Sequence, residues 1–168
     1  RDLVKKGFDV DILADGSLDL PDNLLEKFAW IVASIHTGFK QDNTERLLKA
    51  CEHPSVHCIG HPSGRLIGKR EAYPVDWKKL FEKAAATGTT IEINAQPDRL
   101  DLKDDLVKDA IEKGVTMTIR PDSHALIQFD SMSLGVDVAR RGWCSKENIL
   151  NTSSWEKIEQ FKKNKRKV

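Results

Sequence analysis

The sequence predicts an α/β fold that is built on a parallel sheet. Short β-rich runs alternate with helical stretches five times along the chain, which is the element order of parallel sheets. The run Trp30-Ile31-Val32-Ala33-Ser34-Ile35 is almost continuously apolar, as expected of a strand that is buried on both faces. We see no internal repeat and no low-complexity linker, so we expect residues 1–168 to belong to a single domain.

Local signals place the individual elements. We expect strands at residues 8–13, 30–35, 56–60, 89–94 and 115–119, and helices at 21–27, 44–51, 76–86 and 101–113, followed by a helix-rich tail from about 125. Pro21 suits the first turn of a helix, where its missing N–H costs nothing. Asp101 is placed to cap the helix that Gly114 ends. The basic run at 162–167 is expected to be a solvated helix end or tail rather than a DNA contact.

Composition limits the classes of function. The 27 basic and 26 acidic residues leave a net charge of +1, which argues against binding nucleic acid by bulk charge but allows a local basic groove. No stretch approaches the roughly 20 apolar residues of a membrane span, and the N-terminus does not resemble a signal peptide. Cys51, Cys58 and Cys144 are isolated, so we expect free thiols and a cytoplasmic protein.

Metal-capable side chains fall where the predicted strands end. His36 follows the second strand, His61 the third, and Asp122 and His124 the fifth, while Asp9 lies within the first. Because the carboxyl ends of parallel strands meet on one face of the fold, we expect these side chains to converge. Imidazole and carboxylate together suit Zn²⁺, Mn²⁺ or Fe²⁺, and such a metal activates water for phosphate ester hydrolysis.

Each of these residues also has a simpler interpretation. His36 or His61 alone is compatible with a core or capping histidine, and Asp122-Ser123 with a helix N-cap. Asp9 and Asp11 are unusual in a strand, so we expect one to face solvent or pair with a base while the other points into the site. The tryptophans at positions 77, 143 and 155 are expected in the core rather than as base-stacking platforms.

A set of short motifs is spread along the whole chain. They are Gly7-Phe8-Asp9-Val10-Asp11-Ile12-Leu13, Val32-Ala33-Ser34-Ile35-His36, His61-Pro62-Ser63-Gly64-Arg65-Leu66, Glu92-Ile93-Asn94-Ala95, Pro97-Asp98-Arg99-Leu100-Asp101-Leu102, Asp122-Ser123-His124 and Val138-Ala139-Arg140-Arg141-Gly142-Trp143. Taken together and in this order, these motifs resemble the PHP domain of family X DNA polymerases, and the resemblance covers essentially the whole chain.

The resemblance implies a distorted, TIM-like β/α barrel, of which this chain would supply only the later β/α units. It implies a multinuclear centre of Mn²⁺ or Zn²⁺, with Fe²⁺ or Mg²⁺ as further options. The ligands that it implies are Asp9, His36, His61, Asp122 and His124, with Asp122 and His124 closest to the chemistry. The implied reaction is 3′–5′ exonuclease or phosphatase hydrolysis in DNA repair synthesis; the alternatives are a non-catalytic module that positions DNA and a free-standing phosphatase of small phosphomonoesters.

The sequence departs from the family pattern at three points. The N-terminal His-x-His motif and the residues around it are absent, Asp9 stands where glutamate is usual, and Arg120-Pro121 precedes Asp122 in place of small polar residues. The implied partners are therefore a DNA 3′ end, a polymerase domain and the missing barrel strands. An exposed sheet edge would favour dimerisation.

Arginines are the candidate phosphate or DNA ligands. Arg65, Arg99 and Arg120, with Arg70 as a further candidate, carry the planar donor fork that suits phosphate. Surface ion pairs with neighbours such as Glu71 or Asp98 are the alternative role for them.

Overall fold

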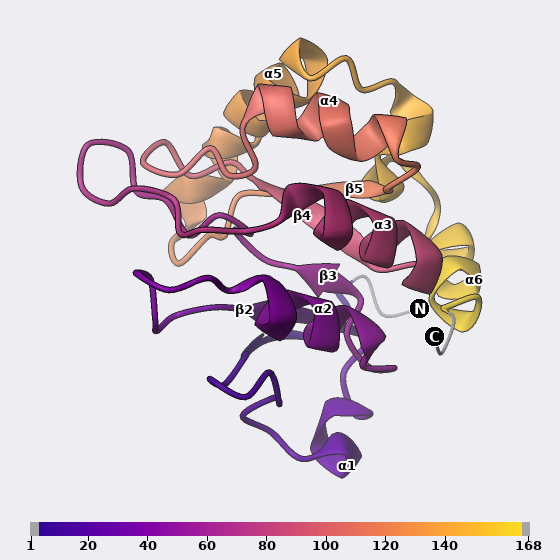
Figure 1. Cartoon of the computed structure of the whole chain (residues 1–168). Coiled ribbons are helices and arrows are strands. Elements are labelled where there is room, and N and C mark those ends of the chain that lie inside the picture. The colour runs from indigo at the N-terminus through magenta and orange to yellow at the C-terminus, as the bar shows by residue number, and fades with distance from the viewer. Residues whose placement is uncertain (1–3, 166–168) are drawn as a thin grey trace.

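The computed structural model describes residues 4–165, and five parallel strands form one sheet in it (Figure 1). The strands are β1 (Gly7–Asp11), β2 (Trp30–Ser34), β3 (Cys58–Ile59), β4 (Thr90–Asn94) and β5 (Met117–Arg120). They lie side by side in chain order, and every neighbouring pair is parallel. The predicted α/β fold with a parallel sheet is confirmed, and its arrangement is consistent with part of a β/α barrel.

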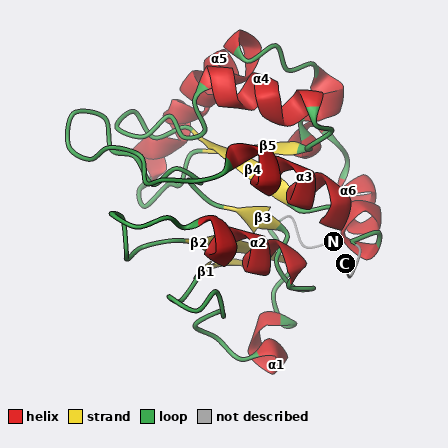
Figure 2. Ribbon diagram, in the orientation of Figure 1, coloured by secondary structure: helices red, strands yellow, loops and turns green. Residues whose placement is uncertain are grey.

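Helices connect the strands, as Figure 2 shows. They are α1 (Asp22–Leu25), α2 (Thr44–Glu52), α3 (Trp77–Thr87), α4 (Asp104–Glu112), α5 (Met132–Arg141) and α6 (Trp155–Lys163), with the short 3₁₀ helices η1 (Leu126–Ser131), η2 (Lys146–Asn148) and η3 (Leu150–Thr152). None of the helices between residues 4 and 165 is long and apolar enough to span a membrane. The last residues of the basic run at 162–167 lie outside the described part of the chain.

Helix boundaries follow local chemistry, with one correction. Asp76 caps α3 by accepting a hydrogen bond from the Lys79 N–H at 3.1 Å, and Gly88 ends the helix at a φ of 71°. The prediction that Asp101 caps the following helix is wrong, because Lys103 is the N-cap residue of α4. Asp101 is fully buried instead, and its carboxylate accepts from the Ser63 N–H at 3.1 Å.

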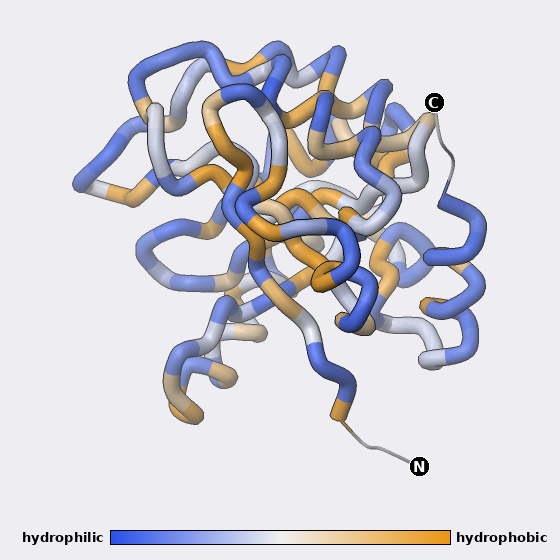
Figure 3. The backbone as a smooth tube through the Cα atoms, turned by 90° about the horizontal axis from the view of Figure 1, so that it is seen from below, coloured by the Kyte–Doolittle hydropathy of each residue, from blue (hydrophilic) through white to orange (hydrophobic). Residues whose placement is uncertain are grey.

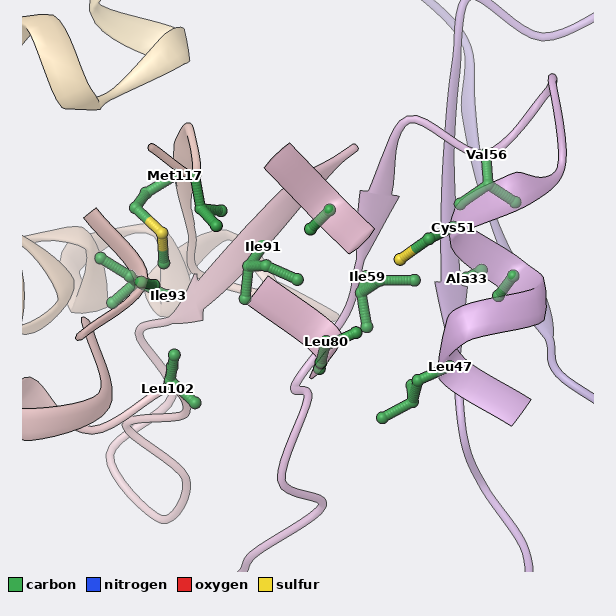
Figure 4. Packing of buried hydrophobic residues seen from close by; sticks show 14 of the residues in the cluster. Ala33, Leu47, Cys51, Val56, Ile59, Leu80, Ile91, Ile93, Leu102 and Met117 are labelled. Atoms are coloured by element: carbon green, nitrogen blue, oxygen red, sulfur yellow. The ribbon is translucent and has the colours of Figure 1, made fainter. Parts of the chain in front are cut away.

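One face of the sheet forms the hydrophobic core. Alternate strand residues, among them Ala33, Ile59 and Ile91, point toward the helices and are fully buried (Figure 4). Helices α2 and α3 contribute Leu47 and Leu80 to the same cluster. The hydrophobic stretches run through the middle of the molecule, and hydrophilic loops surround them (Figure 3). Burial of these side chains supplies the main stabilisation of the fold.

The other face of the sheet is polar. Most residues that alternate with the core positions carry acidic, amide, hydroxyl, thiol or guanidinium groups, whereas Trp30 and Val32 are apolar. The polar ones are Asp9, Asp11, Ser34, Cys58, Thr90, Glu92, Asn94, Thr118 and Arg120. The register places Glu92 beside Thr118 and Asn94 beside Arg120. A cavity of about 180 Å³ lies on this face, lined by Trp30, Thr118, Arg120, Leu150, Asn151, Trp155 and Ile158. Segments η3 and α6 therefore cover part of the polar face and leave its carboxyl end to the candidate site.

Candidate metal centre at the carboxyl ends of the strands

Two predicted histidines meet above the ends of β2 and β3. The His36 and His61 rings lie 5.1 Å apart between centroids, with 66° between their planes. His61 and Asp122 both have positive φ values, of 27° and 47°. Backbone strain of this kind is concentrated at functional sites, because the surrounding structure must enforce it.

A carboxylate fixes the orientation of His36. The His36 Nδ1 atom lies 2.6 Å from Asp11 Oδ1. Ring nitrogens that carry such a partner on one side present the other nitrogen, Nε2, to a ligand. The expectation that one of the two aspartates in β1 pairs with a base is thus confirmed for Asp11.

His61 is buried and neutral. Burial, followed by the charges of Arg99 and His36, lowers the pKa of His61 to about 3. Its backbone N–H donates to Glu92 Oε2 at 2.5 Å, whereas its Nδ1 has no hydrogen-bond partner among residues 4–165. A neutral imidazole with a free nitrogen is the form that binds a metal.

Asp9 is a second buried residue with an oxygen atom that is free to bind a metal. Burial raises the pKa of Asp9 above its usual range, although the nearby Ser34 hydroxyl and then the charges of Arg120 and His36 act in the opposite direction. Its Oδ1 is buried without a hydrogen-bond partner in the described part of the chain. A buried carboxylate oxygen in this state costs free energy unless a cation or a donor meets it.

Asp122 is held in the site by amide side chains. Asn94 Nδ2 donates to Asp122 Oδ2 at 3.2 Å, and Gln96 Nε2 donates to the carbonyls of Pro121 and Asp122 at 2.6 and 2.9 Å. The alternative that Asp122-Ser123 caps a helix is wrong, because Ala125 is the N-cap residue of η1.

His124 lies at the exposed rim of the site. Its backbone N–H donates to Gln128 Oε1 at 2.5 Å, and its Nδ1 lies 2.9 Å from the Asp122 carbonyl oxygen. The turn after β5 thus leaves His124 exposed to solvent, whereas His61 is buried.

An ion pair occupies the polar face beneath these residues. Glu92 is buried, and its Oε1 lies 3.1 Å from Arg120 Nη1. Burial raises the pKa of Glu92 to about 7, against the lowering effect of Arg120. Asn94 Nδ2 also donates to Glu92 Oε2 at 3.3 Å, so contacts link the ion pair to Asp122.

The four candidate phosphate-binding arginines have different environments. Arg65 donates to the main-chain carbonyls of Arg99 (2.8 Å) and Leu100, so much of its fork is already used. Arg99 has a buried Nη1 without a partner within residues 4–165, and its charge reaches His61. Arg120 is engaged by Glu92. Arg70 stacks on Phe39, with the guanidinium carbon 3.6 Å from the ring centroid.

The donor types fit a borderline or hard divalent metal. Asp9, His36, His61 and Asp122 offer carboxylate oxygen and imidazole nitrogen, and the free atoms of Asp9 and His61 are the strongest sign that a ligand belongs here. Within residues 4–165, however, no three His, Cys, Asp or Glu side chains stand at the mutual spacing of a metal cluster. The site therefore brings suitable donors together without a preformed cage.

Sequence reasoning did not assign roles to Glu92 and Asn94. Their signal was visible, since an acidic residue and an amide alternate with isoleucines in β4. Trp143 is a correction: it is 77% exposed rather than part of the core. Trp77 packs against the core, as predicted.

Comparisons with known proteins relate the chain to phosphate ester hydrolases. No family model matches it. It is 42% identical over 163 residues to the DNA polymerase/3′-5′ exonuclease PolX of Bacillus subtilis (strain 168), an alignment that covers 95% of this chain and 29% of PolX. A probable phosphatase of Thermoanaerobacter sp. (strain X514) is 28% identical over 178 residues, which is 98% of this chain and 70% of the phosphatase.

A shorter alignment agrees with these two. A probable phosphatase of Syntrophotalea carbinolica (strain DSM 2380 / NBRC 103641 / GraBd1) is 39% identical over 95 residues, which cover 53% of this chain and 37% of that protein. The chain thus spans less than a third of the PolX length. It is homologous to a segment of a bacterial polymerase with exonuclease activity and to probable phosphatases.

Proposed function

We propose that this chain is a PHP-type, metal-dependent phosphoesterase module. The observation that carries the proposal is the meeting of unpartnered buried donors from Asp9 and His61 with His36 at the strand ends, in the described part of the chain. The names of its relatives, an exonuclease and several probable phosphatases, support the same reaction class.

The chain's residues divide the work by position. Asp9, His36, His61 and Asp122 would hold Mn²⁺ or Zn²⁺, and Asp11 would keep the His36 ring in the orientation for binding. A divalent metal supplies polarisation of the phosphoryl oxygen and a lowered pKa for bound water. Arg99, with a free buried nitrogen near His61, would bind the phosphate. His124, whose Nδ1 lies 2.9 Å from the Asp122 carbonyl oxygen at the exposed rim, is the remaining predicted ligand.

The substrate class is proposed from the relatives. A DNA 3′ end is our first candidate, because the PolX alignment covers 95% of this chain. A small phosphomonoester is the second, because the chain spans 70% of a probable phosphatase. Comparing release of nucleotides from a 3′-labelled oligonucleotide with hydrolysis of p-nitrophenyl phosphate distinguishes the two candidates.

Metal content tests the proposal. We expect the purified chain to retain Mn²⁺ or Zn²⁺ in elemental analysis after dialysis, and we expect His36→Ala to lose most of it. His53→Ala is the matched control, since His53 pairs with Asp22 at 3.1 Å away from the strand ends. His124→Ala measures the contribution of the rim.

Two results would contradict the proposal. One is that the parent chain takes up no metal when Mn²⁺ and Zn²⁺ are supplied, and the other is that His36→Ala and His53→Ala retain equal amounts. A non-catalytic module that supports the polymerase would then be the better interpretation.

A further inference from the structure

Arg120 is a cation among candidate metal ligands. It ends β5 on the polar face, two residues before Asp122 and beside Asn94 in the sheet register. Its side chain is 30% exposed and lines the 180 Å³ cavity on this face. An arginine keeps its charge at every ordinary pH, so this cation is permanent.

Contacts join the arginine to the site. Arg120 Nη1 lies 3.1 Å from Glu92 Oε1, and the other Glu92 oxygen accepts from the backbone N–H of His61 at 2.5 Å. Asn94 bridges the same carboxylate to Asp122. The charge of Arg120 also acts on Asp9. Burial raises the pKa of Asp9, and the positive charge of Arg120 opposes this increase. Asp9, Glu92 and Asp122 therefore all lie within the electrostatic influence of this one guanidinium.

The charge has a direct consequence for ion binding. Two positive charges in a partly buried site repel with an energy that is several times larger than in bulk water. The guanidinium also forms an ion pair with Glu92, which is a fully buried carboxylate. Without this ion pair, the Glu92 carboxylate would be available to bind a metal cation. A divalent ion beside Asp9 and His61 must bind against both effects.

We infer that Arg120 acts as a resident cation that takes the place of one metal charge and sets how tightly, and in what number, divalent ions bind at this site. The inference rests on the proposed function and specifies it: the phosphate of the substrate would meet a centre made of metal and arginine rather than of metals alone. Arg120 is thus a specificity-determining residue for metal loading.

The experiment is a titration of the intact chain with Mn²⁺ alone, by isothermal calorimetry, with thermal unfolding at each metal concentration. Arg120→Gln removes the charge and keeps an N–H donor for Glu92. Arg120→Lys keeps the charge. Arg141→Gln is the control, because it breaks a comparable arginine–carboxylate pair, with Asp104 at 2.8 Å, on an exposed surface.

We expect Arg120→Gln to bind Mn²⁺ at least about tenfold more tightly than the parent, a change that corresponds to about 1.4 kcal/mol. Its unfolding temperature should rise more with added Mn²⁺ than that of the parent, because binding to the folded state stabilises it. Arg120→Lys and Arg141→Gln should match the parent within about twofold, since neither removes charge from the site.

The outcomes separate this inference from the proposed function. If the parent and Arg120→Gln bind Mn²⁺ equally well, the inference is wrong and the phosphoesterase proposal stands. If neither binds Mn²⁺, both are wrong, because the arginine is then not what limits metal binding.

Discussion

At the scale of single residues, Asp11 illustrates how a strand position determines chemistry. It lies two places after Asp9 on the same face of β1, yet its carboxylate contacts His36 Nδ1 at 2.6 Å, whereas the Oδ1 of Asp9 has no hydrogen-bond partner within residues 4–165. Residues that orient a metal-binding histidine contribute strongly to affinity without touching the metal.

We therefore predict that Asp11→Asn weakens Mn²⁺ binding by about 10- to 100-fold. The amide preserves the shape of the side chain but can no longer accept the ring proton with full negative charge. Isothermal calorimetry against the parent measures the change, with exposed Asp19→Asn as the control. An unchanged dissociation constant for Asp11→Asn would show that the His36 contact has no role in ligand orientation.

The candidate residues could be predicted to the extent that strand periodicity determines them. Asp9, His36, His61 and Asp122 were predicted from their positions at or near strand ends, and their role as ligands stays a prediction. The His36 and His61 rings lie 5.1 Å apart, whereas no three His, Cys, Asp or Glu side chains within residues 4–165 have the spacing of a metal cluster. The ring setting of His124 could not be predicted, because it depends on contacts to Gln128 and Asp122 after the strand. The Glu92–Arg120 ion pair required the register between β4 and β5, which no single stretch of sequence contains.

At the scale of elements, polar side chains attach the segments that flank the strands to the sheet. His57 Nδ1 accepts a hydrogen bond from the Ile31 N–H at 3.0 Å, and the ring stacks on Trp30 with centroids 5.0 Å apart. Lys165, just beyond α6, donates to Thr89 Oγ1 at 2.5 Å. Burial, with the nearby charges of Lys162 and Lys165, lowers the pKa of His57 to about 3.

This shift predicts a loss of stability in acid. The folded state holds His57 neutral down to about pH 3, whereas the unfolded chain takes up the proton near pH 6.5. Between these values the unfolded state binds more protons, so stability falls as the pH drops from 6.5 toward 3. His57→Gln keeps an acceptor for Ile31 and removes the titration.

Urea unfolding at pH 7.5 and pH 5 measures the effect. Between these pH values we expect the parent to lose about 1–2 kcal/mol more of its free energy of unfolding than His57→Gln loses. Other titrating groups, such as His61 and Glu92, are common to both chains and cancel in the comparison. Equal losses in the two chains would show that His57 does not contribute to the pH dependence.

Element types were predicted better than their ends. The five strands and the connecting helices match the apolar runs, because the period of hydrophobic residues reflects which face is buried. The third strand shortens to Cys58–Ile59, and α4 begins after Asp101. Asp101 resembles an N-cap in the sequence, but its burial against Ser63 is a long-range contact that local rules do not contain.

At the scale of the whole molecule, the two sheet edges differ. On the β5 side, Ile149 forms a bridge with Met117, and the Asn151 side chain binds the backbone of Ile119 on both its N–H and carbonyl. On the β1 side, the sheet order ends with β1, and Phe8 remains 40% exposed within the described residues. Exposed edges of this kind pair with other chains.

We predict that the chain dimerises through β1 or requires a partner fragment. Size-exclusion chromatography with light scattering should show a dimer whose fraction rises with concentration. Phe8→Lys should shift the population toward monomer, because an edge lysine opposes strand pairing. Lys69→Gln, which alters a charged residue in a distant loop, serves as the control. A parent chain that is monomeric and well folded at all concentrations would refute this prediction.

Core and polar residues alternate along each strand, and this alternation affects which substitutions the protein can tolerate. The core side chains and most of the polar side chains of the strands point to opposite faces of the sheet, so we expect a substitution of a polar-face residue to leave the contacts of the core cluster in place. Most substitutions harm a protein through lost stability, and a site insulated from that cost can accept new chemistry in single steps. Arg120 lies on that polar face beside Asn94, so we expect its replacement to change ion binding at the candidate site without disturbing the packed interior.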